Sequence, residues 1–158
     1  MISYIKKKLK EKVDDKLYNH IIGVSNTCKR LAYYYGVDPY LCEIAGLMHD
    51  YNKQDKLTYN DIKEEDKYDY LETAPAVWHG YVASYEIVDE FKFNNQDVIE
   101  AIKYHTTSKK DLCDVGKILY IADTIEPNRN FSQVEYLRLV EKDLDTHYKK
   151  VLNHCVNF

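Results

Sequence analysis

Apolar residues recur at helical spacing along most of this sequence, and no clear alternation of apolar and polar residues predicts a strand. The clearest apolar stripe, within residues 15–35, is Leu17, Ile21, Val24, Cys28, Leu31 and Tyr35. Only three prolines and five glycines interrupt the 158 residues. The pattern predicts an all-α fold, a single-domain helical bundle that extends over residues 1–158.

Start and stop signals divide the chain into six to eight helices. They are expected over about 2–12, 15–35, 39–50, 75–91 and 111–125, with a further helix capped by Asn95 and a last one after the S-Q-V-E pattern of 132–135. Gly36 is a plausible helix end, and Asp38 followed by Pro39 is a typical helix start. Residues 51–72 are polar and rich in tyrosine, which predicts a loop with short helical turns.

The composition excludes some classes of protein. It is 45% hydrophobic and 30% charged, so the chain can bury a core and does not resemble a disordered protein. Its formal net charge of -4 argues against general nucleic-acid binding. A small anionic ligand is still compatible with this charge, because a local cluster of cations or a metal ion can reverse the local field.

The cysteines and the N-terminus bear on location. Cys28, Cys42, Cys113 and Cys155 are widely spaced and form no C-x-x-C pair, as expected for the reduced thiols of a cytoplasmic protein. The N-terminal stretch MISYIKKKLKEK lacks the apolar run of a signal peptide. No stretch approaches the roughly 20 apolar residues of a membrane helix, so no membrane partner is expected.

Four histidines fall on the inward sides of separate predicted helices. They are His20, His49, His79 and His105. Asp50, which is next to His49, and Asp123, which interrupts the apolar run KILYIAD, occupy similar positions. The remaining two, His147 and His154, lie in the polar last helix, where no role is expected.

This inward cluster favours a metal centre. An unpaired buried carboxylate costs several kcal/mol, so two carboxylates buried with four imidazoles are hard to explain by packing. Imidazole nitrogens and carboxylate oxygens are ordinary ligands of iron, manganese, zinc and cobalt. A single inward histidine is more often a hydrogen-bonded core or helix-end residue. The joint order H…HD…H…H…D on successive helices favours a metal ion instead.

Three stretches of the sequence resemble a known family. They are HDYNK at 49–53, AIKYHTT at 101–107 and YIADTIEPNR at 120–129. Together with the H…HD…D order, they resemble the HD-domain metal-dependent phosphohydrolase superfamily. Within it they are most similar to the bacterial symmetrical bis(5'-nucleosyl)-tetraphosphatases, the YqeK family. The resemblance extends over about residues 15–145, the expected core of the HD domain.

The resemblance implies an all-α, cytosolic, iron-bearing enzyme that hydrolyses diadenosine tetraphosphate to two ADP. It implies one or two iron ions, with manganese, cobalt or zinc as alternatives. By motif position, the implied metal ligands are His20, His49, Asp50 and Asp123. The implied substrate-binding residues are Asp50, Lys53, His79, His105 and Arg129. The partner is then a small nucleotide, and the oligomeric state stays open, with a homodimer as one option.

Asp50, His79 and His105 are the implied catalytic residues. Asp50 would bind a metal ion with one oxygen, while the other orients the attacking water or bridges to a second ion. Two roles stay open for His79 and His105. They could bind a second metal ion, or they could stabilise the transferred phosphoryl group and protonate the leaving phosphate.

Two positions depart from the family's pattern. Ser108 follows the H-T-T motif where glycine is frequent, and Trp78 precedes His79 where a smaller residue is usual. Both changes alter the wall of the expected pocket.

Two alternative functions stay open beside the tetraphosphatase. They are hydrolysis of another nucleotide (a nucleoside mono- or triphosphate, or a guanosine polyphosphate) and a non-catalytic nucleotide sensor.

Overall fold

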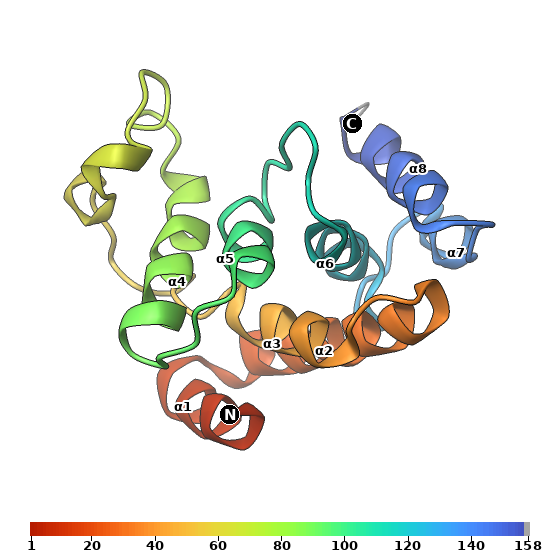
Figure 1. Ribbon diagram of the computed structural model, residues 1–158, viewed down its shortest axis with the longest axis horizontal. Helices are drawn as coiled ribbons and strands as arrows, with labels where there is room; N and C mark the ends of the chain where they lie inside the picture. Colours follow the sequence, from red (N-terminus) through yellow and green to blue (C-terminus); the bar gives the residue numbers. More distant parts are fainter. Residues whose placement is uncertain (157–158) are drawn as a thin grey trace.

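The structure, a computed structural model, describes residues 1–156, which form eight α-helices and no strand (Figure 1). The helices are α1 (Ile2–Lys12), α2 (Asp15–Tyr35), α3 (Pro39–Met48), α4 (Trp78–Asp89), α5 (Gln96–Lys103), α6 (Asp114–Ile125), α7 (Val134–Arg138) and α8 (Leu144–Val156). Three single turns of 3-10 helix, η1 (Tyr59–Asp61), η2 (Glu64–Asp66) and η3 (Pro75–Val77), lie in the long connection before α4. The predicted all-α fold is confirmed.

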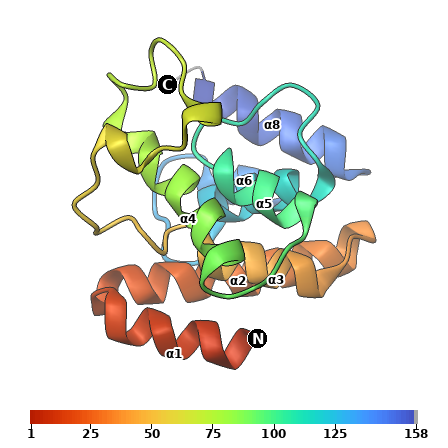
Figure 2. The same ribbon diagram turned by 60° about the vertical axis from the view of Figure 1, so that its left-hand side comes forward.

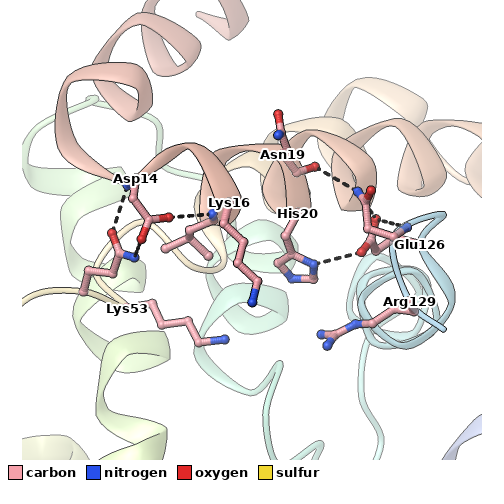
Figure 3. Close-up of a pocket in the computed structure, with 10 residues that line it drawn as sticks. Asp14, Lys16, Asn19, His20, Lys53, Glu126 and Arg129 are labelled. Atoms are coloured by element: carbon pink, nitrogen blue, oxygen red, sulfur yellow. Dashed lines mark hydrogen bonds and ion pairs between the residues drawn. The ribbon is translucent and has the colours of Figure 1, made fainter. Parts of the chain in front are cut away.

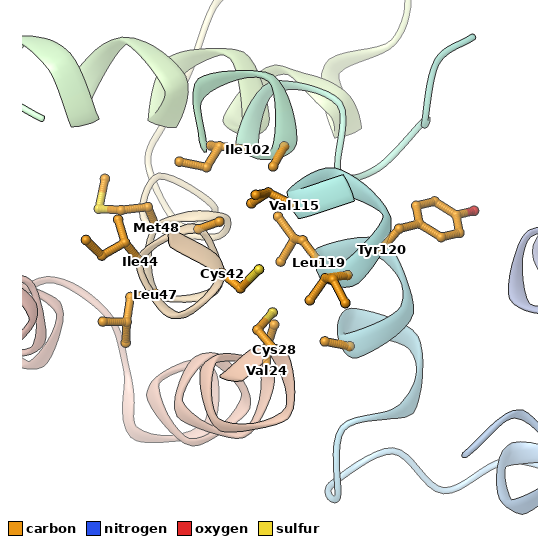
Figure 4. Close-up of a cluster of buried hydrophobic side chains, with 14 of the residues drawn as sticks. Val24, Cys28, Cys42, Ile44, Leu47, Met48, Ile102, Val115, Leu119 and Tyr120 are labelled. Atoms are coloured by element: carbon orange, nitrogen blue, oxygen red, sulfur yellow. The ribbon is translucent and has the colours of Figure 1, made fainter. Parts of the chain in front are cut away.

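Helix α3 lies at the centre of the bundle. It packs against α1, α2, α4, α5 and α6, and residues 42–48 are all buried. A helix covered on every side has no polar face, which is why this stretch reads as apolar throughout. Figure 4 shows its side chains between those of α2, α5 and α6, and Figure 2 shows α1 and α2 side by side below them.

Helices α2 and α3 approach each other unusually closely. A Cβ atom at Gly46 would lie 2.7 Å from the Cα atom of Ser25, so only glycine fits there. The Ser25 hydroxyl also donates a hydrogen bond to the carbonyl of Glu43, at 3.0 Å. This contact sets the C-terminal end of α3, which His49 and Asp50 directly follow, beside the middle of α2, one to two turns after His20.

The predicted helix starts are largely confirmed. The side chains of Asp38 and Asn95 accept hydrogen bonds from the backbone N–H groups of Leu41 and Val98, as N-cap residues do. Gly36 ends α2 with a φ of 73°, in the left-handed region that suits glycine. Helix α6 begins later than expected, at residue 114 instead of 111.

The last predicted helix is wrong in two respects. The chain forms two helices, α7 and α8, instead of one, and Val140, which the apolar spacing of the single predicted helix turned toward the core, is 40% exposed between them. Asp143 accepts a hydrogen bond from the backbone N–H of Thr146 at 2.8 Å, so it starts a new helix in the middle of the predicted one. Ser132 does not cap α7, since Gln133 occupies the N-cap position.

Within residues 1–156, no helix combines the length and the apolarity needed to cross a membrane.

Candidate metal centre

Five separate segments bring the six predicted residues into one cluster. His20 comes from α2, His79 from α4 and Asp123 from α6. His49 and Asp50 directly follow α3, and His105 follows α5. Three overlapping sets of these residues each have their ligand atoms within 4.8 Å of one another. The sequence prediction that these residues converge is therefore borne out by the geometry.

The carboxylate of Asp50 lies at the middle of the cluster and is 2% exposed. Its Oδ2 atom is 3.4 Å from Nε2 of His49 and 3.6 Å from Nε2 of His20. Its Oδ1 atom is 3.2 Å from Nε2 of His79 and 3.3 Å from Nε2 of His105. The two oxygens of one carboxylate therefore face two different pairs of imidazoles.

Asp123 completes the group on the Oδ2 side of Asp50. Its Oδ1 atom is 3.0 Å from Nε2 of His20 and 3.6 Å from Nε2 of His49. This side of the cluster thus holds two imidazoles and two carboxylates, the set expected from the sequence. The Oδ1 side holds the other two imidazoles, whose Nε2 atoms lie 3.2 Å apart.

Two of the ring nitrogens that face the cluster lack hydrogen bonds. Nε2 of His20 and Nε2 of His49 are buried and have no hydrogen-bond partner among the described residues, although carboxylates lie nearby. Nδ1 of His49 is 2.6 Å from the carbonyl of Gly46, and Nδ1 of His105 is 2.8 Å from that of Ile102. A carbonyl can only accept, so each Nδ1 carries a proton, and each Nε2 presents a lone pair when the imidazole is neutral, as metal binding requires. Lone pairs that converge on shared space fit a metal ion.

The charges of the cluster also fit a cation. Burial lowers the pKa of His49, but the carboxylates of Asp50 and Asp123 outweigh it and raise this pKa to about 10. Burial raises the pKa of Asp50, but the surrounding imidazoles hold it well below its usual range. Without a metal ion, a proton on His49 therefore offsets part of the carboxylate charge. A bound cation would take over that neutralisation.

Glu126 belongs to the site, although the sequence analysis gave it no role. It is 1% exposed, and its Oε1 atom lies 3.2 Å from Nδ1 of His20 (Figure 3). Its Oε2 atom accepts hydrogen bonds from the backbone N–H and the side-chain amide of Asn128, both at 3.0 Å. A Cβ atom at Gly23 would collide with this carboxylate, so glycine makes room for it. The sequence signal was a glutamate directly after a buried helix.

Two predicted substrate-binding cations lie at the edge of the cluster. Nζ of Lys53 is 3.5 Å from Oδ2 of Asp50, and Nη2 of Arg129 is 3.2 Å from Oδ1 of Asp123. Their side chains are 50% and 43% exposed. Both line a cavity of about 480 Å³, together with Lys16, which the sequence analysis missed. Figure 3 shows all three side chains extending into the same opening next to His20.

His147, which lies in the polar last helix and for which no role was expected, is fully buried, and its role is structural. The Tyr35 hydroxyl lies 2.7 Å from its Nδ1 atom, and the carbonyl of Leu137 lies 2.8 Å from its Nε2 atom. The carbonyl can only accept, so Nε2 donates to Leu137 and Nδ1 accepts from Tyr35. Both ring nitrogens are thus used between α2, α7 and α8, and His147 takes no part in the metal cluster.

The model of the HD domain family matches residues 17–128. This chain belongs to the HD domain family. The match extends from the start of α2 to the residues after α6 and so includes all six residues of the cluster.

Two relatives show to which branch of the HD domain family this protein belongs. It is 34% identical over 141 residues to the "Bis(5'-nucleosyl)-tetraphosphatase, symmetrical" of Bacillus subtilis, covering 87% of this chain and 76% of that protein. It is 36% identical over 140 residues to the Staphylococcus aureus protein of the same name, covering 87% and 72%. Sequence similarity of this extent makes the chain a member of the symmetrical bis(5'-nucleosyl)-tetraphosphatase family.

A crystal structure has the same fold. A predicted HD superfamily hydrolase involved in NAD metabolism from Clostridium acetobutylicum superposes with a TM-score of 0.89 at 30% identity. The match covers 100% of this chain and 86% of that one. The arrangement of helices that assembles the cluster is therefore shared with a solved HD superfamily protein.

Proposed function

We propose that this HD-domain protein is a metal-dependent hydrolase that cleaves diadenosine tetraphosphate (Ap4A) symmetrically to two ADP. The names of the Bacillus subtilis and Staphylococcus aureus relatives support the reaction. The observation that carries the proposal is the placement of Asp50, whose two oxygens face two separate pairs of imidazoles. Such a carboxylate can serve two cation positions at once, as in the two-metal sites of phosphatases.

The first cation position is formed by His20, His49, Asp50 and Asp123. Its two imidazoles and two carboxylates suit iron, manganese, cobalt or zinc, and the family resemblance favours iron. A metal ion bound there would act as a Lewis acid on a phosphate oxygen and would lower the pKa of the attacking water. Both carboxylates are held in their ionised form by the surrounding imidazoles, so they are ready to bind.

A second cation position is supported by His79 and His105. Their Nε2 atoms and Oδ1 of Asp50 lie within 3.3 Å of one another. The proton on Nδ1 of His105 is used by the carbonyl of Ile102, so in the neutral imidazole its Nε2 atom offers a lone pair to a cation. This favours ligation over proton donation to the leaving phosphate, the two roles that the sequence left open.

Lys53 and Arg129 would neutralise the phosphates of the substrate. Arg129 donates to the backbone carbonyl and to the carboxylate of Asp123, which fixes its guanidinium at the edge of the cluster. Its remaining N–H groups are available to a phosphate, which guanidinium groups bind in a bidentate manner. Lys53 can act as a point charge on the other side of the same opening.

The product distribution tests the proposal. Purified protein, loaded with iron under anaerobic conditions, should convert Ap4A to ADP alone, as resolved by anion-exchange chromatography. Asp50→Ala should abolish turnover and retain a helical circular dichroism spectrum. ATP and AMP as products would refute symmetric cleavage. Turnover of a nucleoside mono- or triphosphate or a guanosine polyphosphate, with Ap4A left intact, would favour the other hydrolase function. Nucleotide binding without phosphate release would favour a sensor.

Metal analysis tests the identity of the cofactor. Protein purified with and without air should differ in bound iron and in activity if iron is the working metal. Reconstitution with manganese, cobalt and zinc provides the comparison.

We also propose a cytoplasmic location, supported by the four cysteines, none of which forms a disulfide in the described part of the chain.

A further inference from the structure

We propose that the two nucleotide halves of the substrate bind in two different cavities, one on each side of Asp50, and that the base of one half stacks on Trp78. This inference rests on the proposed function, since it concerns how a dinucleotide lies across the cluster. The first cavity borders His20, and a second, of about 440 Å³, borders His79. These two histidines face opposite oxygens of Asp50, and Lys53 lines both cavities.

The first cavity is suited to phosphate. Its cations are Lys16, Lys53 and Arg129, which point into the opening (Figure 3). Its two acidic residues are already used. Asp14 accepts from the backbone N–H of Leu17 and from the Gln54 amide, and Glu126 is held by its hydrogen bonds behind His20. The three cations outnumber these two carboxylates, so the lining carries a net positive charge, which suits a phosphate chain.

The second cavity is suited to a base. Leu57, Pro75, Ala76 and Trp78 give it an apolar wall, and Lys53 and Lys56 add positive charge. The one acidic residue among its lining residues is Asp55, which is paired with Lys12 and accepts from Asn52. An aromatic and aliphatic wall beside two lysines is the combination that a nucleotide requires, because the base is flat and apolar and the phosphates are anionic.

Trp78 is fixed in a position from which it can stack. Its indole N–H donates to the carbonyl of Leu71 at 2.8 Å, and its ring packs against Tyr59 with centroids 6.1 Å apart. The tyrosines next to the sequence motifs are less suitable, since Tyr51 is 4% exposed and Tyr81 is 2% exposed. A ring that is already ordered loses little conformational freedom on binding, so it can contribute to affinity.

The substrate is symmetric, whereas these cavities are not. The bond to be cleaved lies at the centre of the four phosphates, so each half is one ADP unit. One half would be held mainly through its base by Trp78, and the other mainly through its phosphates by the cations of the first cavity. A ligand with a base should therefore depend on Trp78, and a phosphate chain without a base should not.

The sequence contains a single tryptophan, so fluorescence of Trp78 reports on this cavity alone. In metal-loaded protein, ADP should change the tryptophan emission saturably, and inorganic pyrophosphate should not.

Trp78→Leu keeps the apolar wall but removes the ring. It should raise the inhibition constant of ADP and the KM for Ap4A about tenfold, with kcat and the inhibition constant of pyrophosphate within about threefold of wild type. Trp78→Phe should restore most of the affinity. Tyr70→Leu, which alters an exposed ring before η3, is the matched control.

Lys16→Ala tests the other cavity. It should raise the KM for Ap4A about tenfold and leave the midpoint of the ADP-dependent change in Trp78 fluorescence unchanged. The inference is overturned if ADP leaves Trp78 emission unchanged, or if Trp78→Leu binds ADP as wild type does. It is also overturned if Lys16→Ala raises the KM for Ap4A and the midpoint of the ADP-dependent fluorescence change by the same factor. If Trp78→Leu does not fold, the wild-type fluorescence decides, through a saturable change with ADP that pyrophosphate does not cause. Failure of the proposed function would be seen separately, as wild-type protein that releases no ADP from Ap4A.

Discussion

Oε1 of Glu126 lies 3.2 Å from Nδ1 of His20, on the ring nitrogen that does not face the metal cluster. A carboxylate at this position orients the imidazole and increases the basicity of its other nitrogen, which is the one that would bind metal. Glu126 is itself anchored by two hydrogen bonds from Asn128. The segment after α6 thus supports a residue of α2, more than 100 positions earlier in the chain.

Glu126→Gln should weaken metal binding. The amide retains the shape of the side chain but loses the negative charge that favours the Nδ1 proton of His20. We expect a loss of about tenfold in metal affinity, because partners of metal ligands typically contribute 10- to 100-fold. Competition with a chelator measures the affinity directly, independent of turnover. Glu64→Gln, at an exposed glutamate, is the control and should bind metal as wild type does. Unchanged affinity in Glu126→Gln would contradict the assigned role.

Gly23→Ala should reduce metal affinity through Glu126. The new Cβ atom would collide with the Glu126 carboxylate and lie 3.2 Å from its Cδ atom. In an ordinary helix the same change stabilises by up to about 1 kcal/mol, so helix propensity alone predicts the opposite sign for stability. The effects of Gly23→Ala and Glu126→Gln on affinity should be strongly non-additive in a double-mutant cycle, because both act on one carboxylate. Additive losses would show that Gly23 acts elsewhere.

The six residues of the cluster could be predicted from the sequence because helical spacing fixes which side of a helix a residue occupies. His20 lies on the stripe of Leu17 and Val24, and His105 follows the stripe of Val98 and Ile102. Each helix must bury its apolar side, so polar residues on that side must meet in the interior. Periodicity therefore identified the members of the cluster, although it could not give the pairing of Asp50 with four imidazoles.

Other features depend on tertiary contacts that periodicity does not report. Glu126 lies beyond the end of α6, outside any helical pattern, and its burial depends on space left by Gly23. The break between α7 and α8 occurs because Asp143 caps a new helix within an apolar pattern that continues through Val140. The sequence predicted Trp78 in the wall of the expected pocket, but only the fold shows which cavity it borders.

His79→Ala should separate the two cation positions. It removes a ligand from the Oδ1 side of Asp50 and leaves the group of His20, His49 and Asp123 intact. We expect the metal content to fall from about two ions per chain to about one, with turnover reduced about 100-fold or more. Elemental analysis of the purified variant gives the content. An unchanged metal content with low turnover would instead support the role of His79 as a donor to phosphate.

Removal of the metal should destabilise the protein. Chelation eliminates a ligand that binds only the folded cluster, which corresponds to about 2.7 kcal/mol when free metal is 100 times its Kd. For a chain of this size, that loss lowers Tm by roughly 5–10 °C. Differential scanning calorimetry with and without chelator measures the shift. Asp123→Ala, which removes one carboxylate of the first cation position, should show a much smaller change in Tm on chelation. Equal shifts in both proteins would mean that the stabilising metal binds elsewhere.

Gly46→Ala should destabilise the bundle at the contact of α2 with α3. The added Cβ atom would lie 2.7 Å from Cα of Ser25, a backbone atom that cannot move without displacing α2. Overpacking of this kind typically costs about 1–3 kcal/mol of the free energy of unfolding. Urea unfolding of the metal-free protein would measure this loss. Asn26→Ala, at an exposed position of α2, should change stability by about 0.5 kcal/mol or less. Because Nδ1 of His49 donates to the carbonyl of Gly46, the variant should also bind metal more weakly. A stable Gly46→Ala variant with normal metal affinity would show that α2 and α3 can separate without disturbing the cluster.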